Sequence, residues 1–253
     1  MSHSHVDFGY PWWLSYGHLV ILVPALALLG LGRWLGWRKW LMIAFGAVAL
    51  WAATAMVMMR SFNVNGLAEL PTESFLRSGE GRVLDIGAGT GRSAIMVLEA
   101  RPRATLVALD QFGHSFEQHF GPSPDPQKRL RDNLAAVGLD QRASIVSADM
   151  RKLPFEPASF DAIVSAYAVD HLGRDGAAQA LGEAARVVKP GGEFLLILVH
   201  NDGWTRFAFG PLLSHGGLRG AGWWRGELEK AGFQVAEEGT RPATLFFLAR
   251  RVA

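Results

Sequence analysis

The hydrophobic positions along this chain follow two unlike patterns. No charged side chain occurs from Pro11 to Gly32 or from Trp40 to Met59. Each apolar run is about 20 residues long, which is the length that a helix needs to cross the hydrocarbon core of a bilayer. Two such runs in succession predict a pair of transmembrane helices, and two buried helices of a soluble core are the less favoured alternative.

After these runs the pattern changes to short apolar strands that alternate with helices. Turn-forming residues between positions 60 and 81 predict a connector. The alternation that follows predicts an α/β fold with a parallel, doubly wound sheet covered by helices on both faces. The predicted segments are a membrane-anchoring hairpin at 1–60, a connector at 61–81 and an α/β domain at 82–253. Within the domain we expect strands at 82–86, 105–110, 143–149, 160–167, 193–199, 233–238 and 243–252, and helices at 92–100, 127–137, 176–188 and 223–231.

Composition narrows the classes of function. Of 253 residues, 49% are apolar and 19% are charged, and the formal net charge is +2. That charge is too small to indicate a surface for nucleic acid. The chain has no cysteine, which excludes disulfides, thiolate metal sites and a cysteine nucleophile.

A glycine-rich turn follows the first predicted strand of the α/β domain. The segment VLDIGAGTGRS (83–93) places Gly87, Gly89 and Gly91 between that strand and a helix. Glycine allows a close backbone approach to a ligand, and a helix N-terminus offers free N–H groups to an acidic or polar ligand group. The spacing differs from the G-x-G-x-x-G pattern of nicotinamide sites, and the carboxylate of Asp85 lies in the strand end.

Further carboxylates end the next two predicted strands. Asp110 lies nineteen residues after Gly91, where a doubly wound sheet brings an acid beside the first loop and within reach of both ribose hydroxyls. Asp149 and Met150 follow the third strand, and they offer a carboxylate to an exocyclic amine and an apolar wall to an adenine. Asp110 alone is better explained as a solvated strand-end residue, but the set in register predicts a nucleoside cofactor.

Taken together, these motifs resemble those of class I S-adenosylmethionine-dependent methyltransferases, in particular the small-molecule and quinone-biosynthesis type. The segments VLDIGAGTG, ALD, SADMRKLPF, SFDAIVSAYAVDHL and ARVVKPGGEFLLI carry the resemblance, which covers residues 83–199. It implies a Rossmann-like sheet of seven strands with the last strand antiparallel, and S-adenosylmethionine as the cofactor. The cofactor-binding residues that it implies are Asp85, Gly87, Ala88, Gly89 and Gly91 for the methionine portion, Asp110 with the adjacent Gln111 for the ribose, Asp149 and Met150 for the adenine, and Ser165 beneath the reactive methyl group.

Two residues after the fourth predicted strand are candidates for chemistry on the methyl acceptor. Methyl transfer from a sulfonium is a direct displacement, so the enzyme mainly aligns the acceptor and excludes water. A base is needed only where the acceptor loses a proton. His171 is a candidate general base because histidine titrates near neutral pH, and Tyr167 is a candidate to orient the acceptor. The alternatives are a histidine that only shapes the pocket and a tyrosine that only packs.

Other segments bear on the class of acceptor. Family members that methylate amino groups of bases or of protein glutamine usually carry residues like Asn-Pro-Pro-Tyr after the fourth strand, whereas this chain has SAYA at 165–168. This difference, with the low net charge, argues against a nucleic acid partner. We expect the aromatic-rich segments 111–126 and 200–222 to cover a hydrophobic acceptor. Their histidines lack metal-ligand spacing, so we expect no metal site.

The short loop GRWLGWRKW (32–40) joins the two apolar runs and carries three cations and three tryptophans. Positive charge in short loops usually marks the cytoplasmic side, which would place both ends of the hairpin outside. Because the implied cofactor is made in the cytoplasm, we instead expect a membrane protein with its catalytic domain on the cytoplasmic side. The hairpin then either spans the bilayer, or enters one leaflet and returns with its cations at the headgroups.

The sequence therefore predicts a membrane-anchored methyltransferase that acts on a lipophilic small molecule or a lipid. The alternative is a membrane-tethered protein that binds S-adenosylmethionine without transferring its methyl group. Aminopropyl transfer is a weaker alternative, because the acid cluster expected after the fourth strand is absent. The oligomeric state and the acceptor atom stay open at this stage.

Overall fold

The computed structural model describes residues 6–209 and 219–252. These residues form two compact units. Among them, residues 6–9, 67–201 and 219–252 belong to the first unit, and residues 10–66 and 202–209 belong to the second. The stretch just before the hairpin is therefore part of the α/β unit, and a stretch after the fifth strand is part of the hairpin unit.

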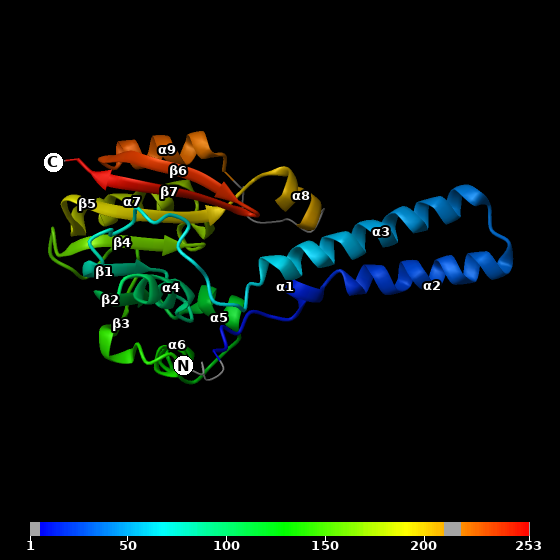
Figure 1. Ribbon diagram of the computed structural model, residues 1–253, viewed down its shortest axis with the longest axis horizontal. Helices are drawn as coiled ribbons and strands as arrows, with labels where there is room; N and C mark the ends of the chain where they lie inside the picture. The colour runs from blue at the N-terminus through cyan, green and yellow to red at the C-terminus, as the bar shows by residue number, and fades with distance from the viewer. Residues whose placement is uncertain (1–5, 210–218, 253) are drawn as a thin grey trace. The chain divides into compact units, whose positions relative to one another are not determined.

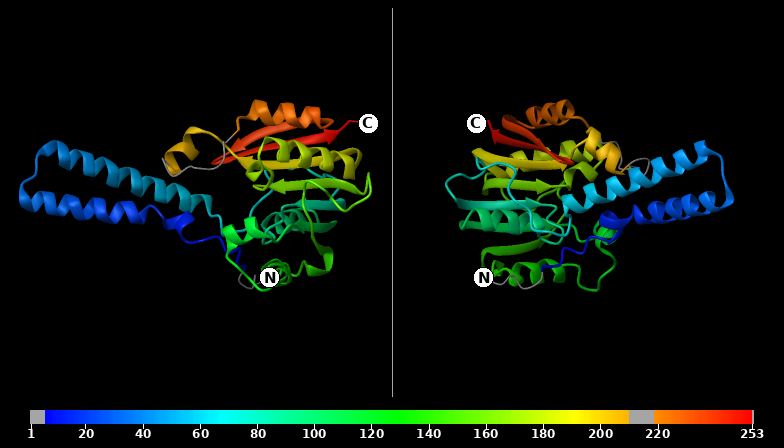
Figure 2. Two further views of the ribbon diagram at one scale, coloured as in Figure 1. Left: turned by 180° about the vertical axis from the view of Figure 1, so that it is seen from behind. Right: turned by 45° about the vertical axis from the view of Figure 1, so that its right-hand side comes forward.

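A seven-stranded sheet runs through the first unit in the order β3-β2-β1-β4-β5-β7-β6 (Figures 1 and 2). The pairings among β1 to β5 are parallel, and β7 lies antiparallel to both β5 and β6. This topology confirms the predicted α/β fold with an antiparallel last strand. The strands are β1 (Glu80–Ile86), β2 (Arg103–Asp110), β3 (Ala143–Ser147), β4 (Phe160–Ala166), β5 (Val188–Val199), β6 (Phe233–Arg241) and β7 (Thr244–Arg251).

The place of β1 in the strand order determines where a ligand can bind. β1 pairs with β2 on one side and with β4 on the other, so the strand order reverses at β1. Leu84 of β1 lies level with Val107 of β2 and Ile163 of β4. In open α/β sheets, ligands bind beyond the carboxyl ends of the strands at such a reversal point. The loops that follow β1, β2 and β4 therefore define the candidate site.

The helices of the first unit agree closely with the predicted ones. The four predicted helices correspond to α4, α6, α7 and α9, with ends that differ by at most two residues. The structure adds a short helix, α5, within the segment 111–126, where the sequence predicted only an aromatic-rich cover. The bounds are α4 (Arg92–Ala100), α5 (His114–Phe120), α6 (Lys128–Ala136), α7 (Arg174–Val187) and α9 (Ala221–Lys230), with 3-10 turns η1 (Asp140–Arg142) and η2 (Val169–His171).

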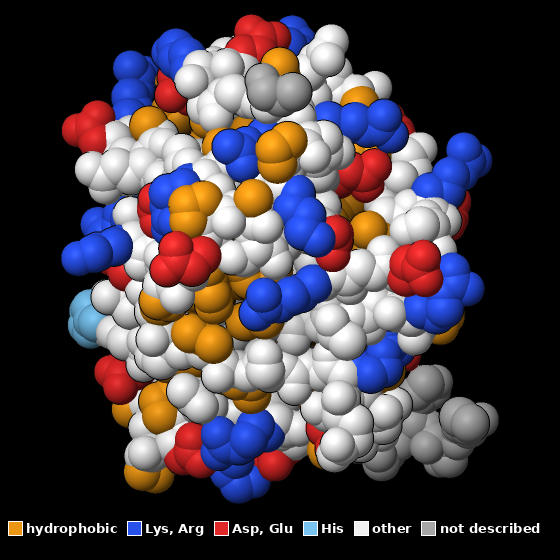
Figure 3. Space-filling view, turned by 90° about the vertical axis from the view of Figure 1, so that its left-hand side faces the viewer, with side chains coloured by type: hydrophobic (Ala, Val, Ile, Leu, Met, Phe, Trp, Pro, Cys, Tyr) orange, Lys and Arg blue, Asp and Glu red, His pale blue; other side chains and the backbone are white. Residues whose placement is uncertain are grey.

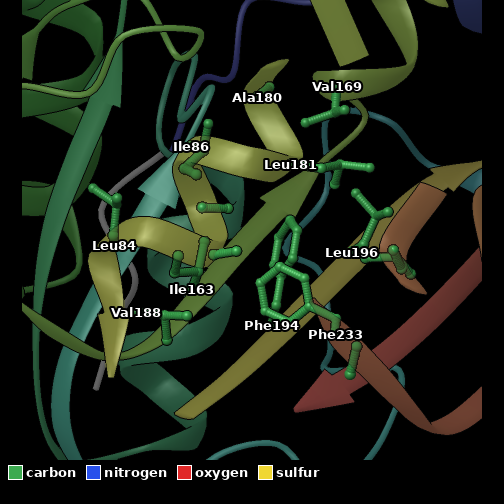
Figure 4. Packing of buried hydrophobic residues seen from close by; sticks show 14 of the residues in the cluster. Leu84, Ile86, Ile163, Val169, Ala180, Leu181, Val188, Phe194, Leu196 and Phe233 are labelled. Carbon is green, nitrogen blue, oxygen red and sulfur yellow. The ribbon is translucent and has the colours of Figure 1, made fainter. Parts of the chain in front are cut away.

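The core of the first unit lies between the sheet and helices α7 and α9 (Figure 4). Side chains alternate along a strand, so Leu84 and Ile86 of β1 point into this core while Asp85 between them points to the other face. On β5 and β6, the rings of Phe194 and Phe233 lie 5.4 Å apart, and both side chains are buried. Burial of this apolar surface is the main source of stability for the sheet, and it fixes the strand ends.

The predicted connector is ordered and packs on the first unit. Phe75 is fully buried, and its carbonyl oxygen accepts a hydrogen bond of 2.7 Å from Nε of Arg101. The backbone N–H of Leu76 donates to the Glu193 carboxylate at 2.6 Å. These contacts make residues 67–79 a structural part of the α/β unit.

The second unit consists of α1 (Trp13–Tyr16), α2 (Leu19–Leu35), α3 (Lys39–Phe62) and α8 (Gly203–Phe209). The two apolar runs coincide with the helical segments Trp13–Leu35, which includes α1 and α2, and Lys39–Phe62, which is α3. Both segments are long and apolar enough to cross a membrane by length and composition. Ala49, Ala52 and Ala55 are buried and recur every three residues, so they form one face of α3. Small residues on such a face allow helices to approach closely.

Helix α8 packs on α3 within the second unit. The indole Nε1 of Trp51 donates a 2.9 Å hydrogen bond to the carbonyl oxygen of Phe207. The rings of Phe62 and Trp204 lie 6.0 Å apart. Contacts of this kind explain why residues 202–209 belong to the hairpin unit although they follow a strand of the sheet. Leu212 and Leu213 of the same predicted cover lie outside the described residues.

One face of the first unit carries charges of both signs. Figure 3 looks onto the starting ends of β1, β4 and β5, and Lys, Arg, Asp and Glu side chains alternate there around a few hydrophobic groups. The bonded pair of Lys189 and Asp161, 2.5 Å apart, joins the starts of β5 and β4. A mixed surface of this kind lacks the one-sided field that binds phosphate backbones.

Candidate functional site

The carboxylate of Asp85 is buried at the end of β1. The hydroxyl of Ser93 on α4 donates a 2.7 Å hydrogen bond to Oδ2, while Oδ1 is buried without a hydrogen-bond partner. Burial raises the pKa of Asp85 to about 7, the nearby Asp110 carboxylate adds to the rise, and the Ser93 hydrogen bond opposes it. A buried acid with a free oxygen suits a ligand that brings a cation, because pairing restores the ionised form.

The three glycines of the loop each adopt a positive φ. The values are 77° at Gly87, 53° at Gly89 and 95° at Gly91. A Cβ at Gly87 would lie 2.3 Å from the Cβ of Ala168, and one at Gly91 would lie 2.5 Å from Cδ1 of Leu130. Only glycine therefore fits these two positions without a shift of the neighbouring groups.

Asp110 fastens this loop to the end of β2. Its Oδ2 accepts a 2.9 Å hydrogen bond from the N–H of Gly89, and its Oδ1 accepts one of 3.1 Å from the N–H of Phe112. The N–H groups of Gly87 and Ala88 both donate to the carbonyl oxygen of Leu109, at 2.8 and 3.0 Å. Asp110 is only partly buried, and each carboxylate oxygen keeps a lone pair for a ligand hydroxyl.

The structure brings some residues of the third strand end to the same loop. Met150 lies beside the loop, because its Cε would be 3.2 Å from a Cβ placed on Gly87. Asp149 is held by Arg151, whose Nη2 lies 2.6 Å from Oδ2, and this side-chain hydrogen bond lowers the pKa of Asp149. Gln111 is exposed, and its carbonyl oxygen accepts a hydrogen bond of 3.3 Å from the Ser147 hydroxyl.

At the end of β4, the predicted site residues have partners within the protein. The buried Ser165 hydroxyl donates to the carbonyl oxygen of Ile86 at 2.8 Å, which joins the ends of β4 and β1. Tyr167 has a φ of 53°, and its hydroxyl lies 2.7 Å from Oγ1 of Thr244 on β7. The observed contact of Ser165 is to backbone, so its role towards a cofactor stays a prediction, as does that of Tyr167 towards an acceptor.

His171 lies in η2 after β4, with a second histidine beside it. The ring of His119 on α5 is 5.0 Å from the ring of His171, at an interplanar angle of 78°. Nδ1 of His119 lies 2.7 Å from the carbonyl oxygen of Ser115. A carbonyl only accepts, so Nδ1 of His119 is the donor in this hydrogen bond. Sequence reasoning singled out His171 alone for proton transfer, because nothing in the spacing of 52 residues between the two histidines signals that they meet.

Within 6–209 and 219–252, no group of three or more His, Cys, Asp or Glu side chains is arranged to hold a metal ion. His119 and His171 provide only two imidazoles. His215 of the predicted histidine set lies outside the described residues.

The residues present fit S-adenosylmethionine. The unpartnered Oδ1 of Asp85 suits the ammonium of the methionine portion, and the positive φ of Gly87 leaves the backbone open for a close approach. Asp110 stands at the end of the neighbouring strand, where it suits ribose hydroxyls. The fit rests on the donor and acceptor chemistry of the loop. The individual assignments stay predictions.

Part of the chain is similar to known methyltransferases. A protein-family model described as a methyltransferase domain matches residues 83–192. The ubiquinone/menaquinone biosynthesis C-methyltransferase UbiE of Rhizobium leguminosarum bv. trifolii is 38% identical over 117 residues, which cover 46% of this chain and 40% of that relative. The chain thus matches less than half the length of this curated relative.

Two solved structures share the fold. One is an O-methyltransferase family protein from Burkholderia thailandensis, with a TM-score of 0.57 and 18% identity, covering 95% of this chain and 70% of that one. The other is a SAM-dependent methyltransferase from Aquifex aeolicus, with a TM-score of 0.52 and 18% identity, covering 78% of this chain and 89% of that one.

The fold and the strand-end loop define a class I, Rossmann-like S-adenosylmethionine-dependent methyltransferase domain, as the motifs predicted. Within it, residues 83–192 match the family model of a methyltransferase domain. S-adenosylmethionine is accordingly the cofactor that this family and fold imply.

Asp85→Asn tests the buried carboxylate. We expect it to weaken S-adenosylmethionine binding by roughly 10- to 100-fold, because a charge-assisted hydrogen bond is lost and the shape is kept. Calorimetry on the detergent-solubilised protein measures this change, and Asp161→Asn, which alters a carboxylate at the opposite end of the sheet, is the control. Equal affinity in the wild type and Asp85→Asn would rule out the assigned role.

The raised pKa of Asp85 also predicts a pH dependence. The folded protein keeps this proton up to about pH 7, whereas the unfolded chain releases it near pH 3.8, the ordinary pKa of an aspartate. The stability that this group contributes is therefore fully present below pH 3.8 and is lost as the pH rises from 3.8 to about 7. A cationic ligand favours the ionised form, so cofactor binding at pH 6 should release a proton. Calorimetry in buffers of different ionisation heat measures that proton, which Asp85→Asn should abolish.

Proposed function

We propose that this protein transfers a methyl group from S-adenosylmethionine to a lipophilic small molecule or a lipid while the second unit anchors it in a membrane. The glycine loop with its buried Asp85, on a methyltransferase domain, is the observation that carries the transfer reaction. The class of acceptor is supported by the similarity to UbiE, a C-methyltransferase of ubiquinone/menaquinone biosynthesis.

The exposed apolar surface of the second unit supports the membrane anchor. Ile43 and Leu50 on α3 are 72% and 70% exposed, and Val20 on α2 is 68% exposed. A soluble core helix hides such side chains, whereas a bilayer solvates them. The 24 residues of α3 span about 36 Å at about 1.5 Å per residue, which exceeds the hydrocarbon thickness of about 30 Å.

The side of the membrane follows from the cofactor. S-adenosylmethionine is made in the cytoplasm, so we place the methyltransferase domain there. Arg33, Arg38 and Lys39 then lie at the tip of the hairpin, either across the bilayer or at the headgroups of the leaflet that the hairpin enters. Trp34 and Trp40 are 81% and 61% exposed, which suits an interface in both arrangements.

Helix α8 follows the last parallel strand of the sheet along the chain but belongs to the unit that holds the hairpin. It begins four residues after β5 ends, and β5 ends on the same edge of the sheet as the cofactor loop. Its own contacts are with α3, through Trp51 and Phe62. We propose that α8 is part of the membrane anchor, with Phe207, 42% exposed, on its apolar surface.

The side chains of the protein have few chemical roles in the reaction. The bound cofactor supplies an electrophilic methyl group on a sulfonium. The domain holds donor and acceptor in line and excludes water. His171, with His119 beside it, accepts the proton of a hydroxyl-bearing acceptor, and Tyr167 orients that acceptor from the end of β4. A tethered protein that binds S-adenosylmethionine without transferring the methyl group is the competing function.

A transfer assay separates these two functions. Full-length protein in detergent is incubated with methyl-labelled S-adenosylmethionine and a total membrane lipid extract, and labelled product and S-adenosylhomocysteine are measured. We expect label in the apolar fraction, and its loss in Gly89→Arg, because that side chain would fill the loop. Cofactor binding without any labelled lipid or S-adenosylhomocysteine would favour the binding protein.

Single cysteines test the membrane arrangement, since the chain has none of its own. Leu35→Cys lies at the end of α2, and the exposed Ser123→Cys lies in the methyltransferase unit as the matched control. We expect an impermeant maleimide to reach Ser123→Cys only after the membrane is opened. Labelling of Leu35→Cys in intact cells then indicates a spanning hairpin, and protection indicates a return within one leaflet. Labelling of Ser123→Cys in intact cells would contradict the cytoplasmic placement.

A further inference from the structure

The segment just before the hairpin is clamped onto the first unit. Phe8 is fully buried. The peptide groups of Asp7 bond twice to the side-chain amide of Asn133 on α6: the Asp7 N–H donates to Oδ1 at 2.9 Å, and the Asp7 carbonyl oxygen accepts from Nδ2 at 2.9 Å. A pair of bonds of this kind fixes the register of the segment as a strand pairing would.

The same amide also holds the cofactor loop. Nδ2 of Asn133 donates a second hydrogen bond to the carbonyl oxygen of Thr90, at 2.9 Å. The Thr90 hydroxyl in turn donates to the carbonyl oxygen of Phe8, at 2.9 Å. Asn133 is 3% exposed and Thr90 is 2% exposed, so water does not compete for these bonds.

Thr90 stands between the two parts of the loop that face a ligand. On one side, the N–H of Gly89 bonds to Asp110, and on the other, Gly91 begins α4 with a φ of 95°. Leu130 of α6 lies directly behind Gly91. Helix α6 and residues 7–8 thus both hold the loop through direct contacts.

We infer that residues 6–9 are a positioning element for the cofactor loop, so that cofactor affinity depends on the segment that leads into the membrane hairpin. Glycine-rich chain loses much conformational freedom when it binds a ligand. A segment that orders the loop before the ligand binds lowers this cost and strengthens binding, and residues 6–9 are called the clamp for this reason. The inference rests on the cofactor site described above, and it adds residues outside the matched segment 83–192 to that site.

The end of the clamp at the start of the hairpin determines what a shortened protein would lose. The clamp ends at Gly9, whose φ is 69° and whose N–H bonds to the Asp7 carboxylate at 2.8 Å. Tyr10 then starts the hairpin unit. A fragment that lacks residues 1–60 would lose the anchor and the clamp together, so we expect it to bind S-adenosylmethionine less tightly than the full chain.

Two substitutions of Thr90 in the full-length protein test the role of its hydroxyl. Thr90→Val keeps the shape and removes the bond to Phe8, whereas Thr90→Ser keeps the hydroxyl. We expect Thr90→Val to raise the Kd for S-adenosylmethionine by about 5- to 10-fold, as for the loss of one buried hydrogen bond. Thr90→Ser should stay within about 2-fold of the wild type, since a hydroxyl of the same reach remains.

Two further measurements separate positioning from mere stability. Ser159→Ala removes a 2.6 Å hydroxyl-to-carbonyl bond in a turn before β4, and it should leave the Kd unchanged. Tm is measured for every variant without cofactor, and the Kd is measured well below each Tm. If Thr90→Val lowers Tm and leaves the Kd unchanged, the clamp is structural only and the inference is wrong. If the wild type itself fails to bind the cofactor, the cofactor site is wrong instead.

Discussion

The buried carboxylate of Asp85 is the constraint around which the first unit, which contains the methyltransferase domain, is arranged. A carboxylate out of water costs free energy unless it is paired, and here only one of its oxygens has a partner. The protein without ligand meets this cost by raising the pKa to about 7. The position is tolerated because β1 is an interior strand of the sheet, and its residues Leu84 and Ile86 on either side of Asp85 are buried in the hydrophobic core.

The loop after β1 shows how rigidity is obtained from flexible residues. Glycines allow the positive φ values and the close packing against Ala168 and Leu130. Glycine alone would leave the loop free to move, so hydrogen bonds from neighbouring elements restrain it. Asp110 holds it from β2, and Asn133 with residues 7–8 holds it from α6. The site is therefore built from four separate stretches of chain.

The second unit raises the opposite problem, because its apolar surface faces outward. Small residues occupy one face of α3, and large aliphatic residues such as Ile43 and Leu50 are exposed. The hydrocarbon of a bilayer would solvate these exposed aliphatic side chains, which is why we propose a membrane anchor. Helix α8 belongs to this unit through its hydrogen bond with Trp51 and its ring contact with Phe62, so the chain returns to the hairpin after β5.

The sequence alone determined the elements whose signals are local. Apolar runs and strand–helix alternation predicted the two long helices and the sheet, because burial imposes a period on neighbouring residues. The loop 83–93 and its acids predicted the cofactor class, because glycine spacing encodes backbone shape. Only the tertiary structure decided which distant groups meet: Phe8 with Thr90, His119 with His171, and α8 with α3. Such contacts depend on how elements pack in space, and the spacing of residues along the chain carries no record of that packing.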